Sequence, residues 1–436
     1  MTANPPHSLA AQYSAVRAQT LALAAPLSEA DCQVQSMPDA SPVKWHLAHT
    51  TWFFETFVLA PHLRGHQPFD AAFRVLFNSY YNGIGAQHPR TQRGLVTRPD
   101  LATVRAYRRA VDAQMADLLG STLAPGVAEL VQLGLQHEQQ HQELVLTDLL
   151  HLLSCNPLAP VYLPWAAAPA PAAAAPGWVD QAGGLVAIGD AGAGFAFDNE
   201  RPRHQQHLRP YALASRPVGQ GDWADFIADG AYAEPRWWMS AGWDWVRSQQ
   251  ITAPLHWRRG GSAGSGSGNT AGWQQFSLHG LQPLQADAPV CHISWFEADA
   301  YARWHAAQHP GSPPTRLPTE AEWEHAAQAV APQALAGGNF LESGALQPLP
   351  ASGGGLQQLL GDVWEWTASP YTAYPGYRPW AGAVGEYNGK FMVNQMVLRG
   401  GSCATPRSHI RSSYRNFFPT DARWQFSGVR LARDAG

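Results

Sequence analysis

Apolar residues recur at helical spacing through the first third of the chain, with Pro and Gly clustered between the segments. Apolar positions three and four residues apart lie on one face of an α-helix, so each segment is predicted to form a helix. The predicted helices cover residues 9–25, 43–59, 101–119 and 127–153. Four helices of this length favour a bundle, whose interior can collect metal ligands from facing helices.

The pattern changes after residue 165. Residues 166–176 have the sequence AAAPAPAAAAP, which predicts a partly extended linker. Beyond it, short aromatic and β-branched runs alternate with Gly, Pro, Asp and Asn. This pattern predicts an irregular α+β domain. The helices expected there are short and cover residues 221–229, 295–308 and 319–329. The glycine-rich stretch 260–268 is expected to be a flexible surface excursion.

A chain of 436 residues is too long for one ordinary core, so more than one domain is expected. We place the helical bundle at 1–165, the linker at 166–182 and the α+β domain at 183–436. Charged residues make up only 14% of the chain, the net charge is -4 and no basic block is present. Neither nucleic acid nor an acidic membrane surface is therefore expected as a partner.

The N-terminus shows no secretory pattern, and no apolar run is long enough to span a membrane. The four cysteines are scattered without CxxC spacing, at Cys32, Cys155, Cys291 and Cys403. This usage suits a reduced cytoplasm, which is the expected location. It argues against a disulfide framework or a thiolate zinc site.

The most informative local motif is His137-Glu138-Gln139-Gln140-His141. Histidines four residues apart share one face of a helix, so both imidazoles can reach one metal ion. Because Glu138 directly follows the first histidine, the motif also matches the zinc-protease pattern. A zinc hydrolase is therefore one interpretation of the short motif.

A second histidine-rich segment, WHLAHTTWFFE, covers residues 45–55 and places His46 and His49 three residues apart. One imidazole from this predicted helix would complete a three-histidine site. Three neutral nitrogen ligands with open positions suit either catalytic zinc or a non-haem iron. At this point a structural role for these histidines also stays open.

Four motifs follow one another in the second half of the chain: RLPTEAEWE, GDVWEWT, LRGGS and GVRL. In the first of them, Thr319 and Glu322 have the spacing of a helix capping box. Each motif by itself is typical of packing and turns. Their order resembles the formylglycine-generating-enzyme domain, a variant of the C-type lectin fold.

Formylglycine-generating enzymes hold copper with a pair of cysteines near the C-terminal end of this domain. In that region this chain has only Cys403. A single thiolate is not a two-coordinate copper site, so the domain is expected to serve another reaction.

The two halves together resemble the sulfoxide synthases of ergothioneine biosynthesis, the hercynine oxygenases, which join a DinB-like bundle to a formylglycine-generating-enzyme-like domain. The resemblance covers essentially the whole chain. Its motifs are WHLAHTTWFFE, NSYYNGIG, HPRTQRG, HEQQHQE, EYNGKFM, RGGSCATP and YRNFFP. It implies an enzyme that uses iron(II) and dioxygen to join a cysteine sulfur to C2 of the hercynine imidazole.

The resemblance assigns the iron ligands to His49, His137 and His141, with His46 as the rival in the first segment. Metal-bound imidazoles usually donate their second nitrogen to a carbonyl or carboxylate. Glu55 and Glu143 are the candidates for that role.

The resemblance also implies the substrate contacts. Hercynine carries a quaternary ammonium, which aromatic faces can hold. The matching residues are Gln140, Asn416, Phe417 and Phe418. Arg90 and Arg93 match the arginines that hold the carboxylate of the sulfur donor.

Phe418 stands where the γ-glutamylcysteine-using branch has an aspartate. Free cysteine is therefore the favoured donor, with γ-glutamylcysteine as the alternative. A selenium-transferring relative that acts on hercynine is the closest functional competitor.

A proton donor near the reacting oxygen favours sulfoxide formation over dioxygenation of the thiol, and a tyrosine hydroxyl can serve. In the free-cysteine branch the matching residues are Tyr80 and Tyr81, with Tyr377 and Tyr387 as runners-up. Two other classes stay open: a zinc hydrolase that uses Glu138, and a non-catalytic binding module.

Overall fold

The computed structural model describes residues 8–164, 176–192, 194–260 and 268–435. The chain forms two compact units. The first comprises Met1–Pro157 with Pro379–Tyr387, and the second comprises Leu158–Arg378 with Asn388–Gly436. Most of the predicted linker, and residues 261–267 of the predicted glycine-rich excursion, lie outside the described residues.

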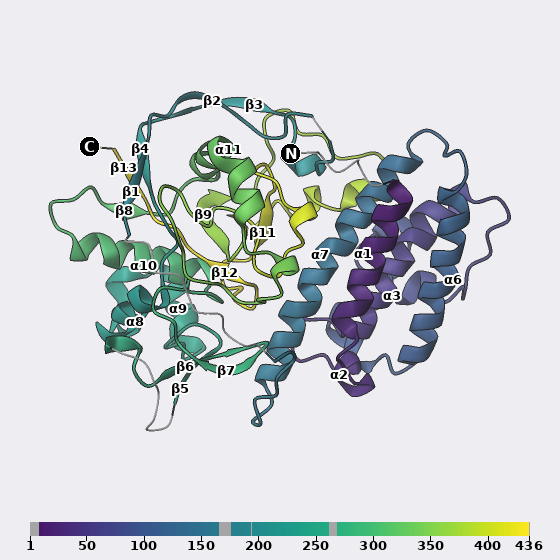
Figure 1. Cartoon of the computed structure of the whole chain (residues 1–436), viewed down its shortest axis with the longest axis horizontal. Coiled ribbons are helices and arrows are strands. Elements are labelled where there is room, and N and C mark those ends of the chain that lie inside the picture. The colour runs from purple at the N-terminus through teal and green to yellow at the C-terminus, as the bar shows by residue number, and fades with distance from the viewer. Residues whose placement is uncertain (1–7, 165–175, 193, 261–267, 436) are drawn as a thin grey trace. The chain divides into compact units, whose positions relative to one another are not determined.

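The described part of the first unit is built on long helices: α1 Leu9–Ala24, α3 Val43–Phe53, α6 Leu101–Leu119 and α7 Val127–Ser154. Helix α7 packs against α1 and α3, and α3 also packs against α6 (Figure 1). Every residue of α3 is buried, as expected for a helix surrounded by others. Shorter helices connect them: α2 Glu29–Gln33, α4 Ala60–His62 and α5 Phe73–Leu76.

The helix that begins at Val43 does not keep α-helical hydrogen bonding to its predicted end. From Phe54 to Leu59 it continues as a π-helix. Single π-turns inserted in α-helices are rare and frequently lie at functional sites. The sequence predicted the length of this helix and not the change in its hydrogen bonding.

The second unit is an α+β domain with two four-stranded sheets, ordered β1-β4-β13-β8 and β11-β10-β9-β12. The first contains β1 Trp178–Gln181, β4 Tyr211–Ala214, β8 Thr315–Arg316 and β13 Ala432–Asp434. The second contains β9 Trp364–Pro370, β10 Met396–Arg399, β11 Asn416–Phe418 and β12 Ser427–Gly428. Smaller sheets pair β2 Gly184–Ile188 with β3 His204–Leu208, and β5 Trp257–Arg259 with β6 Trp273–Ser277 and β7 Gly280–Pro283.

The helices of this unit are α8 Gln220–Ala228, α9 Ser240–Ser248, α10 Trp295–Gln308 and α11 Glu320–Gly337. Three of them were predicted, and α9 was missed. Helix α11 starts with the predicted capping box of Thr319 and Glu322. It is longer than predicted because it continues through Pro332.

The ordered motifs of the second unit meet in its core. The buried Glu365 carboxylate accepts hydrogen bonds from Trp323 Nε1 at 2.7 Å and Arg430 Nη2 at 2.7 Å. Arg399 pairs with Glu324, and both side chains are fully buried. Buried charges persist only when they are paired and hydrogen-bonded, so these motif residues hold the scaffold together.

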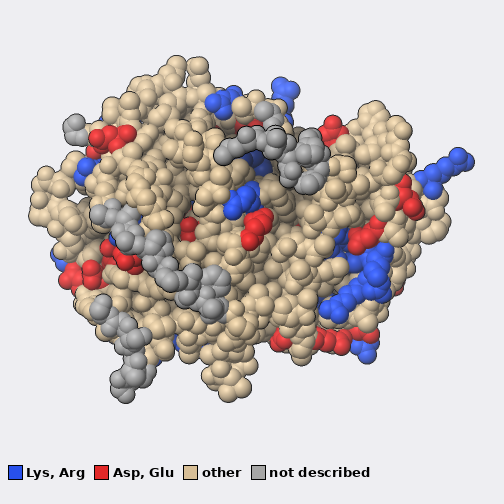
Figure 2. Space-filling view, in the orientation of Figure 1, with Lys and Arg blue, Asp and Glu red and all other residues tan. Residues whose placement is uncertain are grey.

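On the face shown in Figure 2, charged side chains lie in small groups of both signs on a largely uncharged surface. Among the described residues, no helix combines the length and apolar character that crossing a membrane requires.

Candidate metal centre

Three histidine side chains from two helices converge in the first unit. His49 Nε2 lies 3.2 Å from His137 Nε2, and His141 Nε2 lies 3.1 Å from the same atom. The three ligand atoms lie within 4.8 Å of one another, and all three residues are buried. One metal ion bound to all three Nε2 atoms would bridge α3 and α7.

The close approach of these two helices depends on Gly134, one turn before His137 on α7. A Cβ atom there would lie 2.6 Å from Phe54 Cε1 and 3.0 Å from Phe53 Cε1. Only glycine lets the backbone of α7 pack this closely against these aromatic rings. Glycine costs about 1 kcal/mol in a helix interior relative to alanine, and the packing offsets that cost.

Aromatic rings fix the orientation of the three histidines. Trp45 and Trp52 stack on His49, with ring centroids 4.4 Å and 5.5 Å away. The Phe53 ring centroid lies 4.9 Å from that of His137. These contacts restrict the imidazole rotamers and surround the ligands with apolar surface.

Hydrogen bonds at Nδ1 leave Nε2 available on two of the ligands. His49 Nδ1 donates to the Phe77 carbonyl at 2.7 Å, which puts its hydrogen on Nδ1 and its lone pair on Nε2. His141 Nδ1 lies 2.8 Å from His46 Nδ1. His46 therefore contacts a ligand through its side chain and is not part of the three-histidine cluster.

The three imidazoles are held in the neutral form that metal binding needs. Burial, followed by the neighbouring histidines, lowers the pKa of His49 and of His141 well below the usual value. Burial lowers the pKa of His137 to about 3. Three neutral nitrogen donors, prepared to share one centre, fit a divalent transition metal.

Tyrosines line one side of the cluster. The Tyr80 and Tyr81 rings stack at 4.8 Å, and the Tyr81 ring lies 5.6 Å from that of Trp52. The ring of Tyr387 lies 5.7 Å from that of His137 and 6.1 Å from that of Tyr80. Burial raises the pKa of Tyr80 and of Tyr81, so both hydroxyls keep their protons at neutral pH.

Tyr387 reaches this position because Pro379–Tyr387, distant in sequence, groups with the helical unit. Glu386 secures the segment: its carboxylate accepts hydrogen bonds from Asn82 N at 3.0 Å and Gly83 N at 2.7 Å. This contact joins the segment to the loop that directly follows Tyr80 and Tyr81.

The buried Arg93 lies beside the cluster. Its guanidinium stacks over Trp45 at 3.4 Å and donates to the hydroxyls of Ser41 at 2.9 Å and Ser79 at 3.0 Å. No ion pair of Arg93 is found among the described residues. Burial, and after it the charge of Arg90, lowers the pKa of Arg93 to about 9, which leaves it charged at neutral pH.

Models of two protein families match the chain. The DinB superfamily model matches residues 12–145, and the model of the sulfatase-modifying factor enzyme 1-like domain matches residues 166–435. The hercynine oxygenase of Mycobacterium tuberculosis is 32% identical over 98% of this chain and 99% of the relative. That of Mycolicibacterium thermoresistibile is 32% identical over 98% of this chain and 96% of the relative. The formylglycine-generating enzyme of Streptomyces coelicolor is 31% identical over 62% of this chain and 96% of the relative.

The chain belongs to the hercynine oxygenase family. Membership confirms the predicted combination of a DinB-like bundle with a formylglycine-generating-enzyme-like domain. It also identifies the protein as an oxidoreductase that acts on small molecules.

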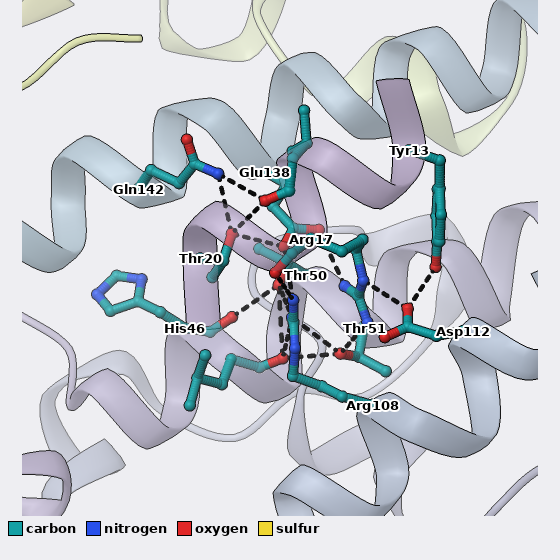
Figure 3. Close-up of polar contacts among 12 residues, drawn as sticks. Tyr13, Arg17, Thr20, His46, Thr50, Thr51, Arg108, Asp112, Glu138 and Gln142 are labelled. Atoms are coloured by element: carbon teal, nitrogen blue, oxygen red, sulfur yellow. Dashed lines mark hydrogen bonds and ion pairs between the residues drawn. The ribbon is translucent and has the colours of Figure 1, made fainter. Parts of the chain in front are cut away.

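Family membership agrees with the surroundings of Glu138, the residue on which the zinc-hydrolase interpretation rests. Its buried carboxylate is bound by Arg17 Nη1 at 2.9 Å, Arg108 Nη2 at 2.8 Å and Thr20 Oγ1 at 2.7 Å (Figure 3). Burial alone would raise the pKa of Glu138, but the two guanidiniums outweigh it and lower the pKa to about 2. A carboxylate held this way joins α1, α6 and α7 and is not placed to activate water.

The prediction that Glu55 orients one of the three histidines was wrong. Glu55 accepts hydrogen bonds from Tyr107 Oη at 2.6 Å and Phe69 N at 2.9 Å. Instead, His49 Nδ1 contacts the Phe77 carbonyl and His141 Nδ1 contacts His46. A backbone carbonyl partner cannot be recognised in the sequence. His46 could be recognised, because it lies three residues before His49 on the same predicted helix.

The other predicted site residues lie as follows. Arg90 is exposed and donates to the Asp39 carbonyl. Gln140 is half-buried on α7, next to the ligand His141. Tyr377 belongs to the second unit, where its hydroxyl donates to Asp198 Oδ2 at 3.1 Å.

Asn416, Phe417 and Phe418 form β11, at the edge of a sheet of the second unit. All three are half-buried. Phe417 stacks on Tyr371 with ring centroids 3.9 Å apart, and Phe418 packs against Trp424.

Proposed function

We propose that this protein is a non-haem iron(II)- and dioxygen-dependent sulfoxide synthase that joins the cysteine sulfur to C2 of the hercynine imidazole. The observation that carries the proposal is the cluster of His49, His137 and His141 in a chain that matches hercynine oxygenases along their length. The thiol and the imidazole C–H each lose a hydrogen as the C–S bond forms. Dioxygen gives one atom to the sulfoxide and the other to water.

The three imidazoles hold the metal, which when bound supplies the dioxygen chemistry. Three protein ligands of an octahedral ion leave positions open for small molecules. The buried, neutral histidines suit iron(II) as well as zinc, so the choice of iron rests on family membership.

Arg93 is proposed to bind the carboxylate of cysteine, with Arg90 as its outer partner. A buried guanidinium without an ion pair gains most from an incoming carboxylate, because the charge is already desolvated. The serine hydroxyls and the Trp45 face hold the guanidinium in place until that carboxylate arrives.

Hercynine is proposed to contact Gln140, Asn416, Phe417 and Phe418. An amide side chain can donate to or accept from the imidazole nitrogens, and aromatic faces attract a quaternary ammonium. In this proposal the helical domain, residues 1–165, carries the metal ligands, and residues 183–436 complete the substrate site after the linker 166–182.

Tyr81 or Tyr80 is proposed to supply the proton that directs the reaction to the sulfoxide. Both hydroxyls are protonated at neutral pH because burial raises the pKa of each. Tyr387 lies in the same aromatic group and is the next candidate.

The test is a single-turnover reaction followed by mass spectrometry. Protein loaded with iron(II) without air receives hercynine with cysteine, or hercynine with γ-glutamylcysteine, and is then exposed to air. We expect the hercynyl-cysteine sulfoxide, in larger yield from cysteine. Zinc-loaded protein is the matched control and should form none. No sulfoxide from either donor with iron bound would overturn the proposed function, and a preference for γ-glutamylcysteine would overturn the choice of donor.

A further inference from the structure

His46 and Asp148 form a hydrogen-bonded chain that ends on a proposed metal ligand. Asp148 Oδ2 lies 3.0 Å from His46 Nε2, and His46 Nδ1 lies 2.8 Å from His141 Nδ1. All three side chains are buried. The same Asp148 oxygen accepts a hydrogen bond from Ser41 N at 2.8 Å, which fixes the carboxylate from the backbone.

Only one arrangement of hydrogens satisfies these contacts with neutral rings. The Nδ1 atoms of His46 and His141 need one hydrogen between them. If His46 supplied it, the bare Nε2 of His46 would face the Asp148 carboxylate, lone pair against lone pair. His46 therefore carries its hydrogen on Nε2 and accepts from His141 Nδ1–H. The lone pair of His141 is thereby left on Nε2, the atom that faces His137 and His49.

We propose that His46 and Asp148 are positioning residues that set the tautomer of His141 and strengthen it as a metal ligand. This proposal rests on the metal centre of the proposed function and assigns roles that the three-histidine motif does not contain. A carboxylate behind an imidazole increases the basicity of a ligand, and here His46 transmits that effect over one further ring.

The chain makes the three ligands unequal. His49 donates to a neutral carbonyl, His141 is connected to a carboxylate, and His137 Nδ1 has no hydrogen-bond partner among the described residues. His141 is thus the ligand with the strongest support. Ser41 connects Asp148 to Arg93, the proposed binding residue for the cysteine carboxylate. Its backbone N–H donates to Asp148, and its hydroxyl accepts a hydrogen bond from Arg93.

The alternative is that His46 only fills space between α3 and α7. Three variants separate the two roles. His46→Leu keeps the bulk and removes the acceptor. His46→Asn places an amide oxygen near the former Nδ1, so it can still accept from His141 Nδ1–H. Asp148→Asn keeps an acceptor oxygen for His46 and Ser41 and removes the charge.

His151→Asn is the matched control. His151 also lies on α7 and is half-buried, but its Nδ1 contacts the Ser36 hydroxyl at 2.8 Å and not a ligand. This change tests the loss of a half-buried imidazole from the same helix without altering the chain of Asp148, His46 and His141, here called the relay.

The experiment measures cobalt(II) binding to the metal-free full-length protein, together with the thermal unfolding of each metal-free variant. The proton NMR spectrum of the cobalt protein in light and heavy water reports the exchangeable Nδ1–H of each ligand. We expect His46→Leu to weaken cobalt binding by about 10–100-fold, the usual cost of losing an outer-shell partner. It should also lose one slowly exchanging shifted N–H signal.

His46→Asn should bind within about threefold of wild type, Asp148→Asn should lie between the two, and His151→Asn should bind as wild type does. Cobalt binding and N–H signals unchanged in His46→Leu would overturn the proposal. Equal weakening by His46→Asn and His46→Leu would also overturn it. If His46→Leu does not fold, Asp148→Asn decides, because unchanged cobalt binding in that folded variant would refute the relay.

None of these readouts uses hercynine, cysteine or dioxygen. A wild-type protein that binds cobalt with the expected N–H signals but forms no sulfoxide would refute the proposed function and leave the relay standing.

Discussion

Tyr387 lies edge-on against His137, with ring centroids 5.7 Å apart and ring planes at 81°, although the two residues come from opposite halves of the sequence. The contact places a residue from the C-terminal half of the chain within the group of rings that surrounds His49, His137 and His141. It is maintained by Glu386, whose carboxylate accepts two backbone N–H groups.

Removing the Glu386 carboxylate should release the loop that carries Tyr80 and Tyr81. In Glu386→Ala, hydrogen exchange at the amides of Asn82 and Gly83 should be about tenfold faster, since a hydrogen bond to a charged group contributes about 1.5–3 kcal/mol. Glu386→Gln retains one acceptor and should lie between. Unaltered exchange at both amides in Glu386→Ala would mean that the carboxylate does not hold the loop.

The tyrosines are tested through the products. Tyr81→Phe or Tyr80→Phe should shift the product from the sulfoxide toward cysteine sulfinate, and the rate of sulfoxide formation should fall by about 10²-fold, the scale of a lost general acid. Tyr387→Phe should have a smaller effect. The product ratio is measured by mass spectrometry with iron-loaded protein. An unchanged ratio in both the Tyr80 and Tyr81 variants would remove the proposed acid.

Arg93 should govern the affinity for the sulfur donor. Arg93→Met should raise KM for cysteine by about 10–100-fold, because a charged hydrogen bond is lost, while KM for hercynine stays near its wild-type value. Arg90→Ala should have a smaller effect, since Arg90 is exposed. Steady-state kinetics with each substrate varied in turn makes the comparison. A larger effect from Arg90 than from Arg93 would move the carboxylate site outward.

Gly134 should be intolerant of a side chain. Gly134→Ala places a Cβ atom 2.6 Å from Phe54 Cε1 and forces α3 and α7 apart. We expect a loss of about 1–3 kcal/mol in unfolding free energy, typical of overpacking, together with weaker metal binding. Gly337→Ala is the control, because a Cβ at the end of α11 meets no atom within 4 Å. Chemical denaturation of both metal-free variants measures the difference, and equal stability of the two would contradict this account of Gly134.

Glu138 should contribute stability that disappears in acid. Folding lowers the pKa of Glu138 from its ordinary value of 4.5 to about 2, so the contribution is complete above pH 4.5 and is lost as the pH falls toward 2. Glu138→Gln removes the carboxylate that Arg17 and Arg108 share and leaves Arg17 with Asp112, which should cost about 3–5 kcal/mol at pH 7. Denaturant unfolding at several pH values should show the two proteins converging in acid. A gap that stays constant with pH would contradict the ion-pair explanation.

Periodicity was enough to predict the long helices and the shared face of His137 and His141. It could not choose between His46 and His49, because both lie near the same face of α3 and only packing against α7 decides which one joins the cluster. The position of Asp148 does carry a signal in the sequence. It follows His141 by seven residues, two helical turns, and therefore lies on the same face of α7.

Other features had no local signal. No residue pattern marks the π-helix Phe54–Leu59, and the Phe77 carbonyl acts through its backbone position. The contact between Glu386 and Asn82 joins distant parts of the chain, and no pattern within either segment predicts it. The prediction that Asn416, Phe417 and Phe418 bind hercynine came from the family resemblance. The spacing of these three residues alone would not indicate a binding site.

The central claim is that one ferrous ion, held by His49, His137 and His141, carries out dioxygen-dependent sulfoxide formation. It is tested most directly by supplying iron-loaded protein with hercynine, cysteine and oxygen-18 dioxygen. The mass of the product is then measured by mass spectrometry. The account predicts a sulfoxide with one oxygen-18 atom from the wild-type protein and none from folded His49→Ala. A sulfoxide without the label, or a labelled sulfoxide formed equally well by His49→Ala, would contradict it.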